Sequence, residues 1–425
     1  DNADRIGFPQ SFTIYEPSDC KNLLKTIVRE LNLDDTKYKP AMLASRISYA
    51  KNCLVTPGAY LANASFGAED RRMQIPEFGN IYNIYCARCK RNGAMDFDDL
   101  LLQTNILLRD CPDVTARYQE QFKYILVDEY QDTNEAQYTF SKLLSAKYRN
   151  IFVVGDNDQA IYAFRGANYK NILNFEKDYP EAKTILLEEN YRSTKTILNA
   201  ANSVIKNNHE RKDKNLWSKN ATGNKIKYKE VANEKEEASF VGTEIKRLLS
   251  EGINEEDIAV LYRTNAQSRV IEEEMLKKNI KYRVVGSFYF YNRKEIKDLV
   301  SYLRLINNNN DDVSLERCIN APKRGIGDKT IETLTEEATT RELSLYETIS
   351  KGKELEFKNL IEDLTKASES LSLTELIDEI LEKTGIKKEL SASKLLEDEI
   401  RLENLNEFKG VTKSYEEEYG TASLG

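Results

Sequence analysis

Acidic residues follow two short apolar runs in this sequence, where they could carry phosphate or metal chemistry. Asp128 and Glu129 come directly after residues 124–127, and Asp156 comes two positions after the run at 151–154. Both runs are too short for a helix and are rich in β-branched and aromatic side chains, so we predict two buried parallel strands. The carboxyl ends of such strands face the ligand crevice of an open sheet. Carboxylates placed there suit a Mg²⁺ ion and a water molecule to be activated.

The polar residues of this stretch can each be given a role. Asp128 would hold Mg²⁺, directly or through water, and Glu129 would orient or deprotonate the attacking water. Gln159 is neutral, so its amide could reach a γ-phosphate or the neighbouring water without adding charge. An isolated Asp-Glu pair after a strand more often only caps a turn. The combined string, DEYQDTN at 128–134 and GDNDQAIYAFRGA at 155–167, favours the chemical roles.

Aromatic and basic residues are interleaved just after Gln159. Tyr162 and Phe164 offer flat faces for bases, and Arg165 offers a cation for phosphate. This combination is typical of the stacking platforms of proteins that bind single-stranded nucleic acid. The alternative is that both aromatic side chains belong to a hydrophobic core.

The elements that must position these residues are predicted from periodicity. Asp96, Asp98 and Asp99 stand at a predicted helix start, where acids suit the helix dipole, so we expect capping and packing roles rather than catalysis. Long helices are expected from about residue 291 onward. The other predicted helices span residues 20–33, 40–52, 76–93, 96–110 and 234–250, and further strands are predicted at 12–14, 184–187, 226–228 and 258–262.

The strings at 128–134 and 155–167 resemble motifs II and III of the UvrD/PcrA/Rep-type superfamily 1 DNA helicases, the bacterial PcrA-like members above all. The resemblance continues collinearly over nearly all 425 residues. It implies an α/β fold with RecA-like parallel-sheet motor domains, both incomplete, and two mainly helical insertion subdomains. The further matching strings are LEENYRSTKTILNAAN at 187–202, AVLYRTNAQSR at 259–269, FYFYNRKEIKDLVSYLRLI at 288–306 and INAPKRGIG at 319–327.

The resemblance also implies domain boundaries. The expected parts are the edge of the first motor domain at 1–19, a helical insertion at 20–95, the first motor domain at 96–189, the first part of the second motor domain at 190–290 and a second helical insertion at 291–425.

By the same resemblance, ATP and Mg²⁺ are the cofactors, and the activity is an ATP-dependent DNA helicase with 3′ to 5′ polarity. Tyr191 would stack on adenine and Arg192 would act as an arginine finger, because its planar fork suits transferring phosphoryl oxygens. The alternative is a plain helix start capped by Ser193. Arg263 and Asn265 follow a predicted strand and could touch the DNA backbone, although turn and capping roles are equally consistent with them.

Residues 322–330 combine cations with glycines at a helix start. Lys323 and Arg324 precede Gly325 and Gly327, whose amides could bind an anion. By resemblance this is a duplex-DNA contact of the second insertion. It is not a G-x-x-x-x-G-K-[ST] phosphate loop, because Asp328 separates Gly327 from the next lysine.

The composition limits the remaining possibilities. The formal net charge of −8 argues against a protein that coats DNA nonspecifically, although local basic patches can still bind DNA. No apolar run reaches the length of a membrane span, and the first residues do not resemble a signal peptide, so we expect a cytoplasmic protein without a membrane partner. Cys86 and Cys89 fall in a helical run without a second ligand pair, so we expect them to pack rather than bind zinc. The single histidine, His209, argues against histidine-based catalysis.

No G-x-x-x-x-G-K-[ST] string occurs in the 425 residues. We therefore expect an internal piece of a longer helicase, inactive alone, that acts on single-stranded and duplex DNA with repair or replication proteins, as a monomer or weak dimer. One alternative is a DNA-binding module without catalysis. Another is a helicase–nuclease subunit of the AddA/RecB sort, which shares these motifs.

Overall fold

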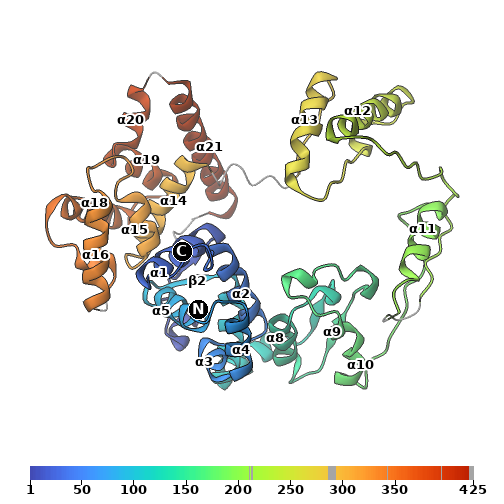
Figure 1. The fold of residues 1–425 in the computed structure, drawn as a ribbon, viewed down its shortest axis with the longest axis horizontal. Helices are drawn as coiled ribbons and strands as arrows, with labels where there is room; N and C mark the ends of the chain where they lie inside the picture. Colours follow the sequence, from blue (N-terminus) through green and yellow to red (C-terminus); the bar gives the residue numbers. More distant parts are fainter. Residues whose placement is uncertain (210, 212–213, 286–292, 342, 394, 421–425) are drawn as a thin grey trace. The chain divides into compact units, whose positions relative to one another are not determined.

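The contacts within the chain divide it into two compact units, Asp1–Thr184 with Asn292–Gly425, and Ile185–Tyr291. The structure is a computed structural model, and it describes residues 1–209, 211, 214–285, 293–341, 343–393 and 395–420 (Figure 1). Helices dominate both units. Among the described residues, no helix combines the length and the apolar character needed to cross a membrane.

The first unit begins with a helical region and ends with the segments that carry the acidic strings. Its elements up to residue 184 are the 3₁₀ helices η1 (Ala3–Ile6), η2 (Tyr130–Asp132), η3 (Asn157–Gln159) and η4 (Ala163–Arg165), the strands β1 (Thr13–Tyr15), β2 (Ala94–Asp96), β3 (Ile125–Val127) and β4 (Ile151–Val153), and the helices α1 (Pro17–Glu30), α2 (Pro40–Asn52), α3 (Pro57–Ala62), α4 (Ala64–Arg72), α5 (Phe78–Arg91), α6 (Phe97–Asp110), α7 (Pro112–Gln121), α8 (Glu135–Ser145), α9 (Lys170–Leu173) and α10 (Phe175–Asp178). The four helices predicted before residue 111 and the short strand near residue 13 are confirmed.

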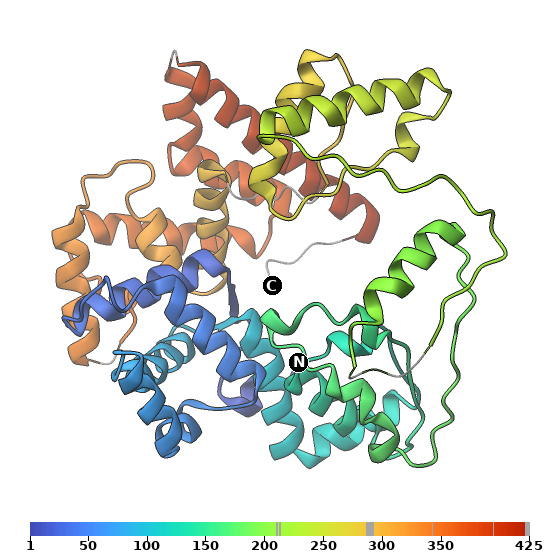
Figure 2. The ribbon, with the colours of Figure 1, turned by 45° about the vertical axis from the view of Figure 1, so that its right-hand side comes forward.

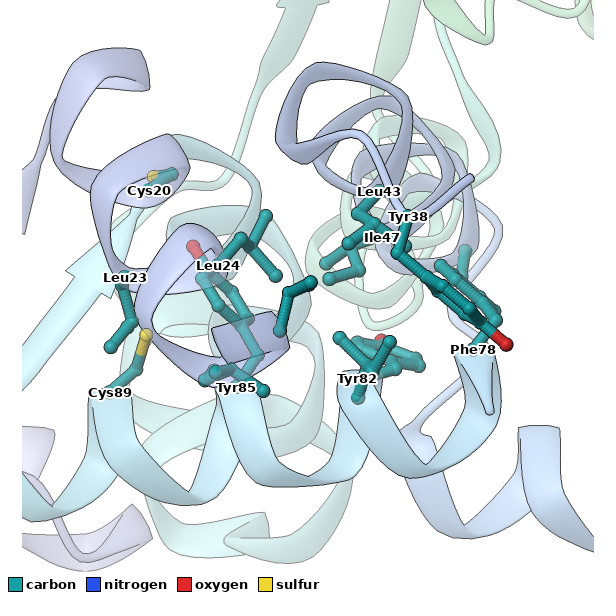
Figure 3. Packing of buried hydrophobic residues seen from close by; sticks show 14 of the residues in the cluster. Cys20, Leu23, Leu24, Tyr38, Leu43, Ile47, Phe78, Tyr82, Tyr85 and Cys89 are labelled. Carbon is teal, nitrogen blue, oxygen red and sulfur yellow. The ribbon is translucent and has the colours of Figure 1, made fainter. Parts of the chain in front are cut away.

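Helices α1, α2 and α5 build the largest core of this unit (Figure 3). Apolar residues at helical spacing on α1, including Leu24 and Ile27, meet Leu43 and Ile47 of α2. Tyr82 from α5 closes the core, and Cys89 lies on the same helix face. Burial of each side chain of this size contributes roughly 1.5–3 kcal/mol to stability.

A buried ion triad joins α2 to the start of α6. The fully buried Lys51 ammonium lies 2.6 Å from Asp96 Oδ2 and 2.7 Å from Asp99 Oδ2, and Tyr85 donates its hydroxyl to Asp96. Asp96 and Asp99 also form a capping box for α6, so the predicted capping role is confirmed. Burial raises the pKa of Asp99. Burial alone would also raise the pKa of Asp96, but the Lys51 ammonium and the hydrogen bonds hold it below its ordinary value.

Strands β3 and β4 pair in parallel, with Leu126 opposite Phe152, as the sequence predicted. Their predicted burial on both faces is wrong, because Leu126 is 73% exposed and Phe152 is 60% exposed. The pair forms a two-stranded sheet, and β1 and β2 form a second one. Among the described residues neither sheet has a further strand. Ile125 packs on the apolar cluster that includes Leu144 of α8, whereas Leu126 and Phe152 leave the other face of the pair exposed.

The helices after residue 292 belong to the same unit and pack on its first region. They are α14 (Lys294–Asn307), α15 (Asp312–Cys318), α16 (Asp328–Arg341), α17 (Leu345–Thr348), α18 (Gly352–Ser368), α19 (Leu373–Lys383), α20 (Ile386–Ala392) and α21 (Leu396–Tyr419). The side chain of Asn308, just after α14, donates to the carbonyls of Asn92 and Gly93 at 2.8 and 3.1 Å. Tyr15 donates to Asp311 at 3.1 Å, and both side chains are fully buried. These polar contacts fix the junction between the two segments.

The second unit holds α11 (Lys195–Ile205), α12 (Glu234–Ser250), α13 (Ser268–Lys277), η5 (Glu255–Asp257) and η6 (Asn265–Gln267). The predicted helix at 234–250 is confirmed, and α12 packs on α13. The long run between α11 and α12 carries neither helix nor strand at residues 221–231 (Figure 2).

Three strand predictions are wrong in the structure. Residues 184–187, 226–228 and 258–262 form no ladder, and the described part of this unit has a single isolated bridge, between Glu189 and Trp217. A strand requires a hydrogen-bonded neighbour, which these apolar segments lack in the described chain. The expected boundary at 290/291 and the beginning of the match at 288–306 lie outside the described residues.

Candidate nucleotide and DNA site

Asp128 and Glu129 stand at the carboxyl end of β3, where both side chains are exposed. Glu129 takes a left-handed backbone conformation with φ 48°, and its N–H donates to Asp128 Oδ1 at 2.8 Å. The turn is held against β4 because Tyr130 N–H donates to the carbonyl of Val154 at 2.9 Å. The strand pair thus holds two neighbouring carboxylates open to solvent.

This donor set suits Mg²⁺. A magnesium ion in a phosphate site is bound by one or two carboxylates, while phosphate and water oxygens fill its other positions. The exposed oxygens of Asp128 and Glu129 can supply those one or two ligands. Over the residues that the structure describes, no three His, Cys, Asp or Glu side chains gather as an all-protein metal cage.

A buried glutamine lies directly behind these carboxylates. Gln131 is 1% exposed. Its Nε2 donates to Glu129 Oε2 at 2.7 Å, and its Oε1 accepts the N–H of Asp156 at 2.9 Å. Gly155 makes room for it, because a Cβ at that position would stand 2.5 Å from Gln131 Oε1. The turns after β3 and β4 are therefore joined through one side-chain amide.

Gln159 lies at the end of η3, which Asp156 caps. Its Nε2 donates to Asp156 Oδ2 at 2.8 Å. The structure therefore brings Asp128, Glu129 and Gln159 into one neighbourhood, with Gln131 and Asp156 between them.

Tyr162 and Phe164 are not core residues, since they are 38% and 71% exposed. Their ring centroids are 5.9 Å apart, and the Arg165 guanidinium lies 5.2 Å from the Tyr162 ring and 5.6 Å from the Phe164 ring. An aromatic pair beside a cation presents both surfaces that a base and its phosphate require.

A groove of about 1020 Å³ opens beside Phe164 and Arg165, and Tyr49 of α2 and Phe97 of α6 line it as well. Asn52 also lines this groove. It donates to Asp98 at 2.8 Å and accepts from Asn134, the last residue of the first acidic string, at 2.7 Å. The helical region and the motif-bearing loops thus meet at this groove.

Tyr191 and Arg192 lie in the second unit, and both side chains are exposed. Asn190 holds their turn, because its Oδ1 accepts the N–H of Arg192 at 3.1 Å and of Ser193 at 2.8 Å. Tyr191 donates to Glu189 at 3.1 Å, and this hydrogen bond raises the pKa of Tyr191. The alternative in which Ser193 caps the helix start is wrong, since Thr194 is the N-cap residue of α11.

Arg263 and Asn265 also lie in the second unit, at the start of η6. Their side chains are exposed. The turn itself is built by Gln267, whose Oε1 accepts the N–H of Arg263 at 3.0 Å and of Thr264 at 2.9 Å. The capping role therefore belongs to neighbours, which leaves both side chains directed outward.

The two cations of the loop at 322–327, Lys323 and Arg324, lie in different surroundings. Lys323, Gly325 and Gly327 are exposed. Arg324 instead turns inward: its Nη2 donates to the Tyr302 hydroxyl at 2.8 Å, and its guanidinium lies 5.3 Å from the Phe357 ring. Its Nη1 also reaches the carbonyls of Cys318 and Ile319 at 3.2 Å each. In this structure Arg324 braces the loop from within.

Comparisons with known proteins identify the family of this chain. The model of the UvrD/REP helicase N-terminal domain matches residues 1–180, and that of the UvrD-like helicase C-terminal domain matches residues 185–423. The chain belongs to the UvrD-like helicase family. It has the α/β character of that family, with helices in the majority.

Curated members of the UvrD-like helicase family are similar over most of this chain. "ATP-dependent DNA helicase PcrA" of Staphylococcus aureus (strain Mu50) is 48% identical over 427 residues, which cover 98% of this chain and 58% of that protein. The protein of the same name from Staphylococcus epidermidis is 47% identical over the same shares. The chain thus spans about 58% of the length of these relatives.

Sequence analysis missed one residue of this candidate site, Gln131, and gave Arg324 a DNA contact rather than an inward role. Gln131 stands inside the acidic string, and the signal for it was a neutral amide between Glu129 and Asp132 together with a glycine at 155. The inward direction of Arg324 had no signal in the sequence, because its partners at 302 and 357 lie far away along the chain.

Proposed function

We propose that these residues form part of an ATP-dependent DNA helicase or translocase that unwinds duplex DNA in repair or replication, with 3′ to 5′ polarity. The observation that carries the proposal is the pair of exposed carboxylates, Asp128 and Glu129, at the end of β3, with Glu129 linked to Gln159 by hydrogen bonds through Gln131 and Asp156. Membership of the UvrD-like helicase family and the names of the staphylococcal relatives support it.

In this proposal the chain's own residues carry out most of the ATP chemistry. Asp128 would hold Mg²⁺, which when bound would supply positive charge beside the phosphates. Glu129 orients the attacking water and accepts its proton at a carboxylate oxygen. Gln159 contacts the γ-phosphate or that water, and Arg192 supplies a planar cation to the phosphoryl oxygens. Tyr191, with 78% of its surface exposed, offers its ring to adenine.

The DNA contacts fall into two groups. Tyr162, Phe164 and Arg165 stack and pair with single-stranded DNA beside the groove. Lys323 and the amides at Gly325 and Gly327 meet duplex phosphates. We assign Arg263 and Asn265 to the DNA backbone and Arg324 to bracing the loop at 322–327.

We further assign RecA-like motor domains to this chain, in the arrangement expected from the sequence. The parts are the edge of the first motor domain at 1–19, the first helical insertion at 20–95, the first motor domain at 96–189, the first part of the second at 190–290 and the second insertion at 291–425.

ATP hydrolysis tests the proposal. The 425-residue chain is compared with an extended chain, in which it is joined to the parts of the S. aureus relative that the match does not cover, with and without single-stranded DNA. Hydrolysis by the extended chain that DNA stimulates supports the proposal. An extended chain that binds DNA but never hydrolyses ATP contradicts it.

A DNA-binding module without catalysis is the second candidate, and the exposed Phe164 and Lys323 favour it. It predicts salt-sensitive gel-shift binding by the 425-residue chain, because phosphate contacts release counterions. Binding that does not weaken between 50 and 200 mM salt, a range over which about 10³-fold loss is typical of several phosphate contacts, contradicts it.

A further inference from the structure

The buried amide of Gln131 is placed to do more than fill space. It is held at both ends, by a carboxylate on one side and a backbone N–H on the other. The carboxylate of Glu129 can only accept, and the N–H of Asp156 can only donate. Only a side chain that both donates and accepts satisfies the two groups, which identifies the amide orientation without ambiguity.

The surrounding backbone is adapted to this amide. Gly155 lacks the Cβ that would stand 2.5 Å from Gln131 Oε1 and 3.1 Å from the Tyr130 nitrogen. The turn containing Gln131 is fixed on β4 through Tyr130 N–H and the carbonyl of Val154, 2.9 Å apart. A movement of the peptide between residues 155 and 156 therefore reaches Gln131 directly.

The peptide between residues 155 and 156 is also close in the chain to the residues proposed to contact DNA. The Asp156 carboxylate accepts from Gln159 at 2.8 Å and from the N–H of Asp158 at 2.9 Å. Tyr162 and Phe164 follow three and five positions after Gln159. The segment returns to the first acidic string, where the N–H of Asn168 donates to the carbonyl of Thr133 at 2.9 Å. Hydrogen bonds thus link Glu129 to Gln159 through Gln131 and Asp156, and the backbone continues from Gln159 to the aromatic pair.

We propose that Gln131 is a positioning residue that holds the Glu129 carboxylate and couples it to the segment at 155–165, so that DNA stimulates ATP hydrolysis through this amide. The inference rests on the proposed function for its catalytic consequence. Its geometric part, the bridge from Glu129 to the Asp156 N–H, does not depend on that function.

Three variants of the extended chain test the catalytic part. Gln131→Met keeps the volume but removes the hydrogen bonds to Glu129 and Asp156, together with the longer one to Asp132 Oδ2 at 3.4 Å. Gln131→Glu keeps an acceptor for Asp156 and places a second carboxylate beside Glu129. Gln119→Met is the matched control, because the Gln119 amide donates only to the carbonyl of Leu143, at 2.7 Å in the same unit.

With saturating single-stranded DNA, we expect Gln131→Met to lower kcat about tenfold or more, the loss expected for one hydrogen bond to a charged group. The KM for ATP should stay within about twofold and the stimulation by DNA should fall, since substrate binding is left intact. Gln131→Glu should lose at least as much, and Gln119→Met should keep both kcat and stimulation. Equal kcat and stimulation in Gln131→Met and the unchanged chain overturn the inference.

A double variant separates positioning from general damage to the fold. In a Glu129→Gln background, Gln131→Met should cost little further activity, because its effect passes through the Glu129 carboxylate. A further tenfold loss there overturns the positioning role.

Hydrogen exchange on the 425-residue chain tests the bridge without reference to ATP. Gln131→Met should speed exchange of the Asp156 amide about tenfold or more, while Gln119→Met leaves it unchanged. Unchanged exchange in Gln131→Met overturns the bridge. If the unmodified extended chain hydrolyses no ATP, the proposed function fails, and this exchange measurement still decides the role of Gln131 in the fold.

Discussion

Charged groups are buried in the helical region around α1, α2 and α5, but they are exposed in the loops after β3 and β4. In the helical region the Lys51 ammonium is fully buried and pairs with Asp96 and Asp99. In the loops Asp128 and Glu129 remain exposed, although both follow a strand. Both regions belong to one compact unit. The difference in exposure therefore separates charges that stabilise the fold from charges that are available to a ligand.

The two regions differ in the partners of their charged groups. The triad at Lys51 is complete within the protein, and its desolvation cost is offset by its own ion pairs and hydrogen bonds. The carboxylates at the end of β3 keep most of their oxygen atoms available for a ligand. The first region holds the fold together, and the second is supported by it while remaining open for chemistry.

The largest contrast is expected from Glu129→Gln in the extended chain. Loss of a general base lowers ATP turnover roughly 10²–10⁴-fold, while nucleotide binding should survive because the side chain keeps its size. The measurement is steady-state hydrolysis beside binding of a fluorescent ATP analogue. Glu181→Gln, at an exposed ion pair with Arg149 in the same unit, is the control and should hydrolyse normally. Retained turnover in Glu129→Gln would remove this residue from its proposed role.

Lys51→Met should affect stability instead. Removing the ammonium leaves two buried carboxylates without their cation, which typically costs about 3–5 kcal/mol. Urea unfolding of the 425-residue chain measures this loss, with the exposed Lys183→Met as control. If both variants unfold at the same urea concentration, the triad is not the support that the contrast requires.

The buried carboxyl group of Asp312 is expected to make the stability of the fold depend on pH. Burial raises the pKa of Asp312 to about 7, and the nearby Glu316 and Asp311 carboxylates add to this, although the Leu345 N–H and Arg91 oppose it. The folded chain therefore keeps this proton up to about pH 7, whereas an unfolded chain releases it near pH 4. The resulting stability is present at low pH and is lost as the pH rises from about 4 to about 7.

Asp312→Asn should remove that part of the pH dependence, on the order of 2–4 kcal/mol between pH 4 and 8. The amide keeps an oxygen for the Leu345 N–H, which donates to Asp312 at 2.7 Å. Urea midpoints at several pH values provide the measurement. A variant whose midpoints follow those of the unchanged chain would show that Asp312 does not titrate in this range.

The smallest effect is expected for the exposed Phe164, which is compared with the buried Phe78 as a reference. Phe164→Ala should weaken single-stranded DNA binding by about 1–3 kcal/mol, the range for loss of one stacking ring, and leave stability nearly unchanged because the ring is exposed. Phe78→Ala, in the fully buried core, should lower stability by about 3–5 kcal/mol. Gel shifts and urea unfolding of both variants test the pair. Destabilisation by Phe164→Ala would mean that its ring packs inside the fold.

Local patterns predicted the helices well, because their cores follow a helical spacing that the sequence displays directly. The range 40–52 of α2 and the range 234–250 of α12 were predicted residue for residue. The parallel pairing of β3 and β4 was also predicted, since short apolar runs ending in acid are typical of such strands. The roles proposed for Asp128 and Glu129 came from the same local signal and stay predictions.

Long-range features could not be predicted from those patterns. The exposed face of Leu126 depends on which strands and helices lie beside β3, and the missing ladders at 226–228 and 258–262 depend on partner strands. The Lys51 triad joins side chains 45 and 48 positions apart. Hydrogen bonds from Gln131 to Asp156 and from Arg324 to Tyr302 likewise connect residues that no periodicity relates.

The open face of the β3–β4 pair also affects how the chain associates with itself in solution. Leu126 and Phe152 stand opposite each other in register and point to the same side, with Tyr124 exposed at the strand entrance. An uncovered apolar strand pair is a template for sticking to other chains. We expect the purified 425 residues to form reversible, concentration-dependent aggregates during chromatography, and Leu126→Lys to return them to a single small species. We therefore expect oligomers of the 425-residue chain to form through this exposed sheet face. Size-exclusion chromatography would then detect a partner that covers the face, because such a partner would return the chain to its monomeric size.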